Sequence, residues 1–85
     1  MDTKIIRVSL EPMEFGRFFA SSPDMRGLHL TGADLEGLAA EVEIAIEAIF
    51  EAKGTPVRAQ RLAATDPKYA LWGATPVQLP ARRRA

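Results

Sequence analysis

The stretch between residues 15 and 36 constrains the fold more than any other part of the chain. Residues 15–21 are rich in aromatic side chains, which is typical of a strand. Residues 23–27 carry turn chemistry, with a proline, an aspartate and a closing glycine. Residues 28–31 alternate as a further short strand, and Asp34 is suited to cap a helix. Two strands, a tight turn and a capped helix thus fall within very few residues, almost none of which could do chemistry.

The flanking segments predict the remaining regular structure. Residues 4–11 alternate between apolar and polar side chains, the period of a half-buried strand. From Asp34 to Lys53 the apolar side chains recur at helical spacing, and Gly54 follows as the expected left-handed stop. The side chains predicted to form the buried core between helix and sheet are Val8, Leu10, Leu30, Val42, Ile46 and Ile49.

After the helix the pattern is weaker. Residues 57–63 predict a fourth strand, although two alanines weaken it. Residues 70–74 fit either a further short strand or a docked loop with Trp72 as its anchor. The predicted fold class is α+β: an antiparallel sheet of three to four strands with one helix packed on one face, in the order β-β-β-α-β. Residues 1–64 are expected to form this domain, and residues 65–85 a C-terminal extension with a frayed basic tail.

Composition and residue types argue against an enzyme. The chain has no cysteine, which excludes disulfides and thiolate metal sites. Its only histidine, His29, lies between two leucines in a predicted strand and fits an exposed residue without a chemical role. Asp24 and Asp34 have structural explanations as a turn residue and a helix cap. We therefore expect no catalytic residues, no metal site and no cofactor.

The predicted location is the cytoplasm. No apolar run approaches the roughly 20 residues of a membrane span. The first residues lead directly into a predicted strand and lack a secretory pattern.

Charge is unevenly distributed although the formal net charge is +0. The predicted helix holds six carboxylates against Lys53 alone, and four of them share one side: Glu36, Glu43, Glu47 and Glu51. Two interpretations stay open. The stripe is either an ordinary solvated face or a surface that meets a basic protein partner. In both, Glu43 and Glu47 are expected to be exposed.

Basic residues lie outside the helix and support an alternative function. Arg7 and Arg17 lie in the first half of the chain, Arg58 and Arg61 follow the helix, and Arg82, Arg83 and Arg84 lie near the end. They could serve a nucleic-acid-associated accessory protein. A neutral total charge makes nucleic acid the less favoured partner, because nucleic-acid-binding domains are usually basic overall.

In the order of its elements the chain resembles the HicB family of bacterial antitoxins. Residues 8–12 end an aliphatic strand in Glu-Pro, and residues 18–27 run an aromatic strand into a Pro-Asp-x-x-Gly turn. Residues 32–36 give a glycine and a capped helix that opens with Leu-Glu. The resemblance covers roughly residues 4–63 and extends to small HicB-related domains that occur alone.

This resemblance implies a partial RNase H-like fold without RNase chemistry. It also implies a non-enzymatic module that neutralises a HicA-type toxin, a small basic RNA-cleaving protein. The family typically carries a C-terminal DNA-binding domain; we do not expect one in residues 64–85, because these residues are too few for a helix-turn-helix and Pro67, Pro76 and Pro80 oppose a long helix. We further expect a homodimer, formed by strand pairing at a sheet edge or by packing of the segment around Leu71 and Trp72.

Overall fold

A computed structural model describes residues 3–63 and 66–77 of the chain. Five strands and one long helix follow one another, with a short 3-10 helix between the first two strands. In chain order the elements are β1 (Lys4–Pro12), η1 (Glu14–Gly16), β2 (Phe18–Ser21), β3 (His29–Gly32), α1 (Leu35–Ala52), β4 (Val57–Arg61) and β5 (Ala70–Pro76).

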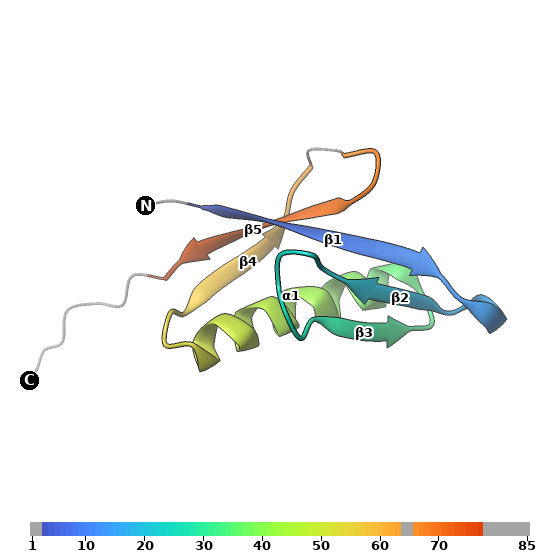
Figure 1. Cartoon of the computed structure of the whole chain (residues 1–85), viewed down its shortest axis with the longest axis horizontal. Helices are drawn as coiled ribbons and strands as arrows, with labels where there is room; N and C mark the ends of the chain where they lie inside the picture. Colours follow the sequence, from blue (N-terminus) through green and yellow to red (C-terminus); the bar gives the residue numbers. More distant parts are fainter. Residues whose placement is uncertain (1–2, 64–65, 78–85) are drawn as a thin grey trace, which may run out of the picture.

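The strands form one antiparallel sheet in the order β3-β2-β1-β5-β4, and α1 packs against one of its faces (Figure 1). The α+β prediction is confirmed, with five strands in place of three to four. The additional strand is β5, which lies between β1 and β4. The described part of the predicted C-terminal extension therefore supplies an inner strand of the sheet.

β1 joins the two halves of the sheet. Its first half pairs with β5, from Lys4 opposite Ala74 to Val8 opposite Ala70. Its second half pairs with β2 on the other side, starting with Ser9 opposite Ser21. The two halves are thus offset along β1, and the sheet curls so that α1 contacts both edge strands, β3 and β4 (Figure 1).

Hydrophobic side chains from both layers form one core. α1 contributes Leu38, Val42 and Ile46, each no more than 1% exposed. The sheet contributes a fully buried group consisting of Ile6, Val8 and Trp72. The predicted core residues Val8, Val42 and Ile46 are confirmed as buried. Three others, Leu10, Leu30 and Ile49, are only partly buried against this cluster.

Local signals in the sequence fix the bounds of α1. The Asp34 side chain accepts a hydrogen bond from the Gly37 backbone N–H at 2.6 Å, as expected of an N-cap. Gly54 follows the helix with a φ of +81°, a conformation that glycine adopts without strain. The predicted start and end of the helix are both confirmed.

The prediction that β2 begins at residue 15 is wrong. Residues 14–16 form η1, and β2 starts only at Phe18. Phe15 has φ 63° and ψ 32°, in the left-handed region that non-glycine residues rarely occupy. Its side chain is 94% exposed. The aromatic ring therefore does not pack in the sheet, and the residue belongs to the tip of the β1–β2 hairpin.

Two isoleucines of α1 provide a matched test of the core. Ile46 is fully buried, whereas Ile44 is 67% exposed. We expect Ile46→Ala to lower the free energy of unfolding by about 2–5 kcal/mol, because it leaves a cavity. Ile44→Ala should change it by less than about 0.5 kcal/mol. Urea unfolding followed by the fluorescence of Trp72, the only tryptophan, measures both. Equal losses in the two variants would contradict this core.

Candidate interaction site

Two glutamates of α1 accept hydrogen bonds from the backbone of β4, one of the two edge strands of the sheet. The Ala59 backbone N–H donates to Glu47 Oε2 at 2.9 Å, and the Arg61 N–H donates to Glu43 Oε2 at 3.2 Å. The indole N–H of Trp72 also donates to Glu43 Oε2, at 3.3 Å. Since β4 is an edge strand, these carboxylates occupy N–H groups that would otherwise be open to another strand.

The spacing of the four groups explains this arrangement. Four residues advance about 6 Å along a helix, and two residues advance about 6.7 Å along a strand. Glu43 and Glu47 therefore match Ala59 and Arg61 when the helix lies along the strand. Alternate residues of an edge strand point their N–H groups the same way, so both bonds form on one side.

The expectation that Glu43 and Glu47 are exposed is wrong. Both are partly buried, and their carboxylates hold β4. Glu36 and Glu51, the other two residues of the predicted stripe, are exposed. The structure therefore splits the stripe into one pair that holds the sheet edge and one pair that faces solvent.

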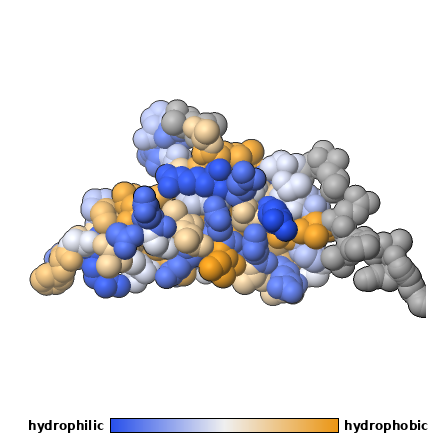
Figure 2. Space-filling view, turned by 180° about the vertical axis from the view of Figure 1, so that it is seen from behind, coloured by the Kyte–Doolittle hydropathy of each residue, from blue (hydrophilic) through white to orange (hydrophobic). Residues whose placement is uncertain are grey.

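The exposed side of α1, here called its outer face, combines carboxylates with small apolar residues. Its members are Glu36, Ala40, Glu41, Ile44, Ala48 and Glu51. α1 carries no lysine or arginine. Seen from behind the view of Figure 1, hydrophilic and apolar residues are interspersed over the described surface (Figure 2). Sequence reasoning missed Glu41 and Ile44 as members of this face.

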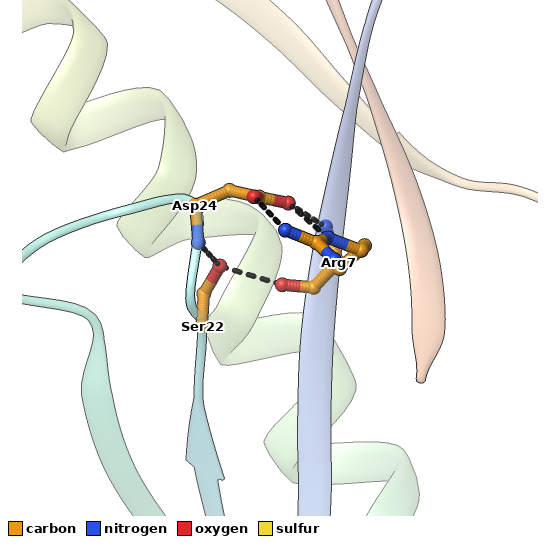
Figure 3. A network of polar contacts seen from close by, with 3 residues as sticks. All are labelled: Arg7, Ser22 and Asp24. Carbon is orange, nitrogen blue, oxygen red and sulfur yellow. Dashed lines mark hydrogen bonds and ion pairs between the residues drawn. The ribbon is translucent and has the colours of Figure 1, made fainter. Parts of the chain in front are cut away.

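A second polar network lies where β1 and β2 diverge (Figure 3). The Arg7 side chain donates to both carboxylate oxygens of Asp24, at 3.0 and 2.7 Å, and its backbone N–H donates to Oδ2 at 2.9 Å. The Ser22 hydroxyl donates to the Arg7 carbonyl at 2.5 Å and accepts from the Asp24 N–H at 3.0 Å. The last β1–β2 pair joins Ser9 and Ser21. Beyond it, the side chains of Ser22 and Asp24 form hydrogen bonds with the backbone C=O and N–H of Arg7 in place of β2.

This network shifts the pKa of Asp24 and the pKa of Arg7. The hydrogen bond from the Arg7 side chain, together with the one from its backbone, lowers the pKa of Asp24. The same pairing raises the pKa of Arg7. The Arg7 guanidinium also lies 5.5 Å from the centre of the Tyr69 ring. Arg7 is thus engaged in the fold. Sequence reasoning missed this ion pair because its members come from separate segments.

Among the described residues, the arginines of the alternative function do not gather on one surface. Arg58 and Arg61 are three positions apart on β4, so their side chains leave opposite faces of the sheet. The Arg61 guanidinium lies 5.3 Å from the centre of the Trp72 ring. Arg17 donates to Thr31 Oγ1 at 3.3 Å. The basic tail of Arg82, Arg83 and Arg84 lies outside the described residues.

His29 lies at the rim of a shallow depression. It is exposed on β3, and its ring stacks on Phe19 with centroids 6.0 Å apart. The depression, of about 550 Å³, is also lined by Ser9 and Glu11, whose side chains bond to each other at 3.2 Å. Across residues 3–63 and 66–77, no hydrogen bond joins His29 to either of them, and no cluster could hold a metal ion. The lining of the depression thus includes an imidazole, a hydroxyl and a carboxylate.

A neighbouring depression of about 490 Å³ lies beside the β4–β5 connection and shares Leu10, Lys68 and Tyr69 with the first. Both are open and shallow surfaces.

Within the described part of the chain, no helix is long and apolar enough to cross a membrane. Comparison of the chain with protein-family models, curated proteins and solved structures gives no match.

The role of Glu47 in holding β4 can be tested against Glu51, an exposed glutamate one turn away. We expect Glu47→Ala to lower the free energy of unfolding by about 1–2 kcal/mol, because the Ala59 N–H loses its charged acceptor. Glu51→Ala should change it by less than about 0.5 kcal/mol. Urea unfolding measures both, and hydrogen exchange at Ala59 should accelerate only in Glu47→Ala. Unchanged exchange would argue against the capped edge.

Asp24 predicts a dependence of stability on pH. A carboxyl whose pKa is lower in the folded chain stabilises the fold above its unfolded-state pKa, and this contribution disappears as pH falls through the folded-state pKa. The stability gap between the natural chain and Asp24→Asn should therefore be constant at neutral pH and shrink below about pH 4. Urea unfolding at a series of pH values measures the gap. A gap that stays constant into strong acid would show that Arg7 does not hold Asp24 ionised.

Proposed function

We propose that the chain is a non-enzymatic protein-binding module of the HicB antitoxin type. Its partner would be a small basic RNA-cleaving protein of the HicA type. The observation that carries the proposal is the outer face of α1, where exposed carboxylates lie on both sides of Ile44 along the helix and α1 carries no basic side chain. A surface of this kind complements a basic protein whose own working surface binds RNA.

The division of the glutamates refines which residues would meet the partner. Glu43 and Glu47 hold β4 and have a structural task. Glu36, Glu41 and Glu51 have carboxylates exposed to solvent. Ile44, 67% exposed between them, gives the face an apolar centre. An apolar centre within a polar rim is the usual composition of a protein interface.

The position of the arginines favours this function over the nucleic-acid alternative. Arg7 is held by Asp24, and Arg58 and Arg61 leave opposite faces of β4. Nucleic-acid binding relies on several cations that reach the phosphates together. Among the described residues, the arginines that could serve such contacts are dispersed.

A binding titration tests the proposal with a catalytically inactivated HicA-type toxin as the probe. The double variant Glu41→Lys with Glu51→Lys should slow association at low salt by roughly tenfold, because it reverses two charges of the outer face. Its fold should be retained, since both residues are exposed. The matched control is Glu11→Lys with Glu14→Lys, which changes the net charge equally away from α1 and should bind as the natural chain does.

Two outcomes would contradict the proposal. Equal slowing in both double variants would show that net charge, not the outer face, governs binding. Absence of toxin binding combined with tight, salt-dependent binding of a mixed oligonucleotide would favour the nucleic-acid alternative.

A further inference from the structure

The two edges of the sheet differ in how their backbone groups are occupied. β4, at one edge, gives two N–H groups to the glutamates of α1. β3, at the other edge, pairs with β2 on its inner side. Among residues 3–63 and 66–77, no side chain accepts a hydrogen bond from a backbone N–H of β3, and Figure 1 shows no element beyond it. β3 is therefore the edge open to a further strand.

The segment around Trp72, which was the other predicted route to a dimer, offers no free strand edge among the described residues. Trp72 is 0% exposed, and β5 is paired on both sides by β1 and β4. This segment has no free edge and its indole is already in the core. Strand pairing at β3 remains.

The charges that flank β3 fit a second copy of the same chain. Arg26 precedes the strand, is exposed, and forms no ion pair or hydrogen bond with a described residue. Asp34 follows the strand. One of its carboxylate oxygens accepts from Gly37, and no described residue donates to the other. A strand with a cation before it and an anion after it is complementary to an antiparallel copy of itself.

We propose that two copies of the chain pair antiparallel through β3, about a two-fold axis at Leu30. In this register His29 lies opposite Thr31 of the second copy, and the turn that carries Arg26 lies at the same end of the pairing as the second copy's Asp34. In an antiparallel pair, side chains directly opposite each other point to the same face of the sheet. Two copies related by a two-fold axis perpendicular to the sheet meet this condition only if one residue lies opposite its own copy across the axis. Arg26 and Asp34 each lie four residues from Leu30 along the chain, so an axis at Leu30 brings the cation before β3 of one copy to the same end as the anion after β3 of the other.

Apolar contact adds to this pairing. Leu35, the first residue of α1, lies three residues after the end of β3 and is 45% exposed. Its exposed side chain is available to a second copy that pairs with β3. β3 has only four residues, so the interface is small. We expect a reversible dimer with a dissociation constant on the order of micromolar or weaker. This dimer does not depend on the proposed toxin partner.

Sedimentation velocity tests the pairing with the chain alone, from about 10 µM to about 1 mM. The mass should rise with concentration from 9.3 kDa towards twice that value. Arg26→Glu should weaken association at least tenfold. Arg58→Glu is the matched control: it makes the same charge change on the exposed side of β4 and should leave association unchanged. A mass of one chain at every concentration would overturn the proposal, as would equal effects of the two variants.

Cysteine cross-linking tests the register, because the natural chain contains no cysteine. A mixture of His29→Cys and Thr31→Cys chains should form interchain disulfides faster than either variant alone, since the two positions are opposite only across the two-fold axis. Gln60→Cys, exposed on β4, should cross-link no faster than random collision allows. Equal rates for the mixture and the separate variants would exclude this register, and faster cross-linking at position 60 would place the interface at the other edge.

Discussion

The sheet depends on the backbone pairing of β1, the one strand that belongs to both of its halves. β5 occupies one side of its first residues, and β2 occupies the opposite side of its last ones. Where the ladder to β2 ends, the side chains of Ser22 and Asp24 bond the backbone of Arg7 in its place. Because the halves are offset, the sheet can curl around α1 and bring both edge strands to the same helix. This curl encloses the core between α1 and the sheet, and it brings β4 close enough for the glutamates of α1 to bond its backbone.

The part of this fold that the sequence predicts is local. The alternation around Ile6 and Val8 predicts β1, and Asp34 and Gly54 predict both ends of α1 because each acts on its immediate neighbours. The position of Trp72 in the core depends on β5 pairing between β1 and β4, and no local pattern encodes the order of strands in a sheet. The left-handed turn at Phe15 is likewise set by the hairpin and not by the preference of an aromatic residue.

In the candidate site, the sequence likewise does not show which charged side chains are exposed and which are bonded within the fold. Helical periodicity places Glu43 and Glu47 on one side of α1, and from the sequence that side is indistinguishable from a solvated one. Their neighbours in space, Ala59 and Arg61, belong to a strand whose distance from the helix appears only in the folded chain. The repulsion between the two carboxylates at i, i+4 spacing is offset by the N–H groups that each accepts. An acidic stripe on a helix can thus be partly a structural device and partly a recognition surface.

The place of β5 between β1 and β4 has a consequence for how the chain folds as it is made. β1 is synthesised first, but its neighbour on one side is β5, separated from it by the whole helix and three other strands. Until β5 emerges, β1 and β4 have no partner between them and the core lacks its indole. Closure of the sheet is therefore a late, non-local step, and nascent chains carry an unpaired central gap until then.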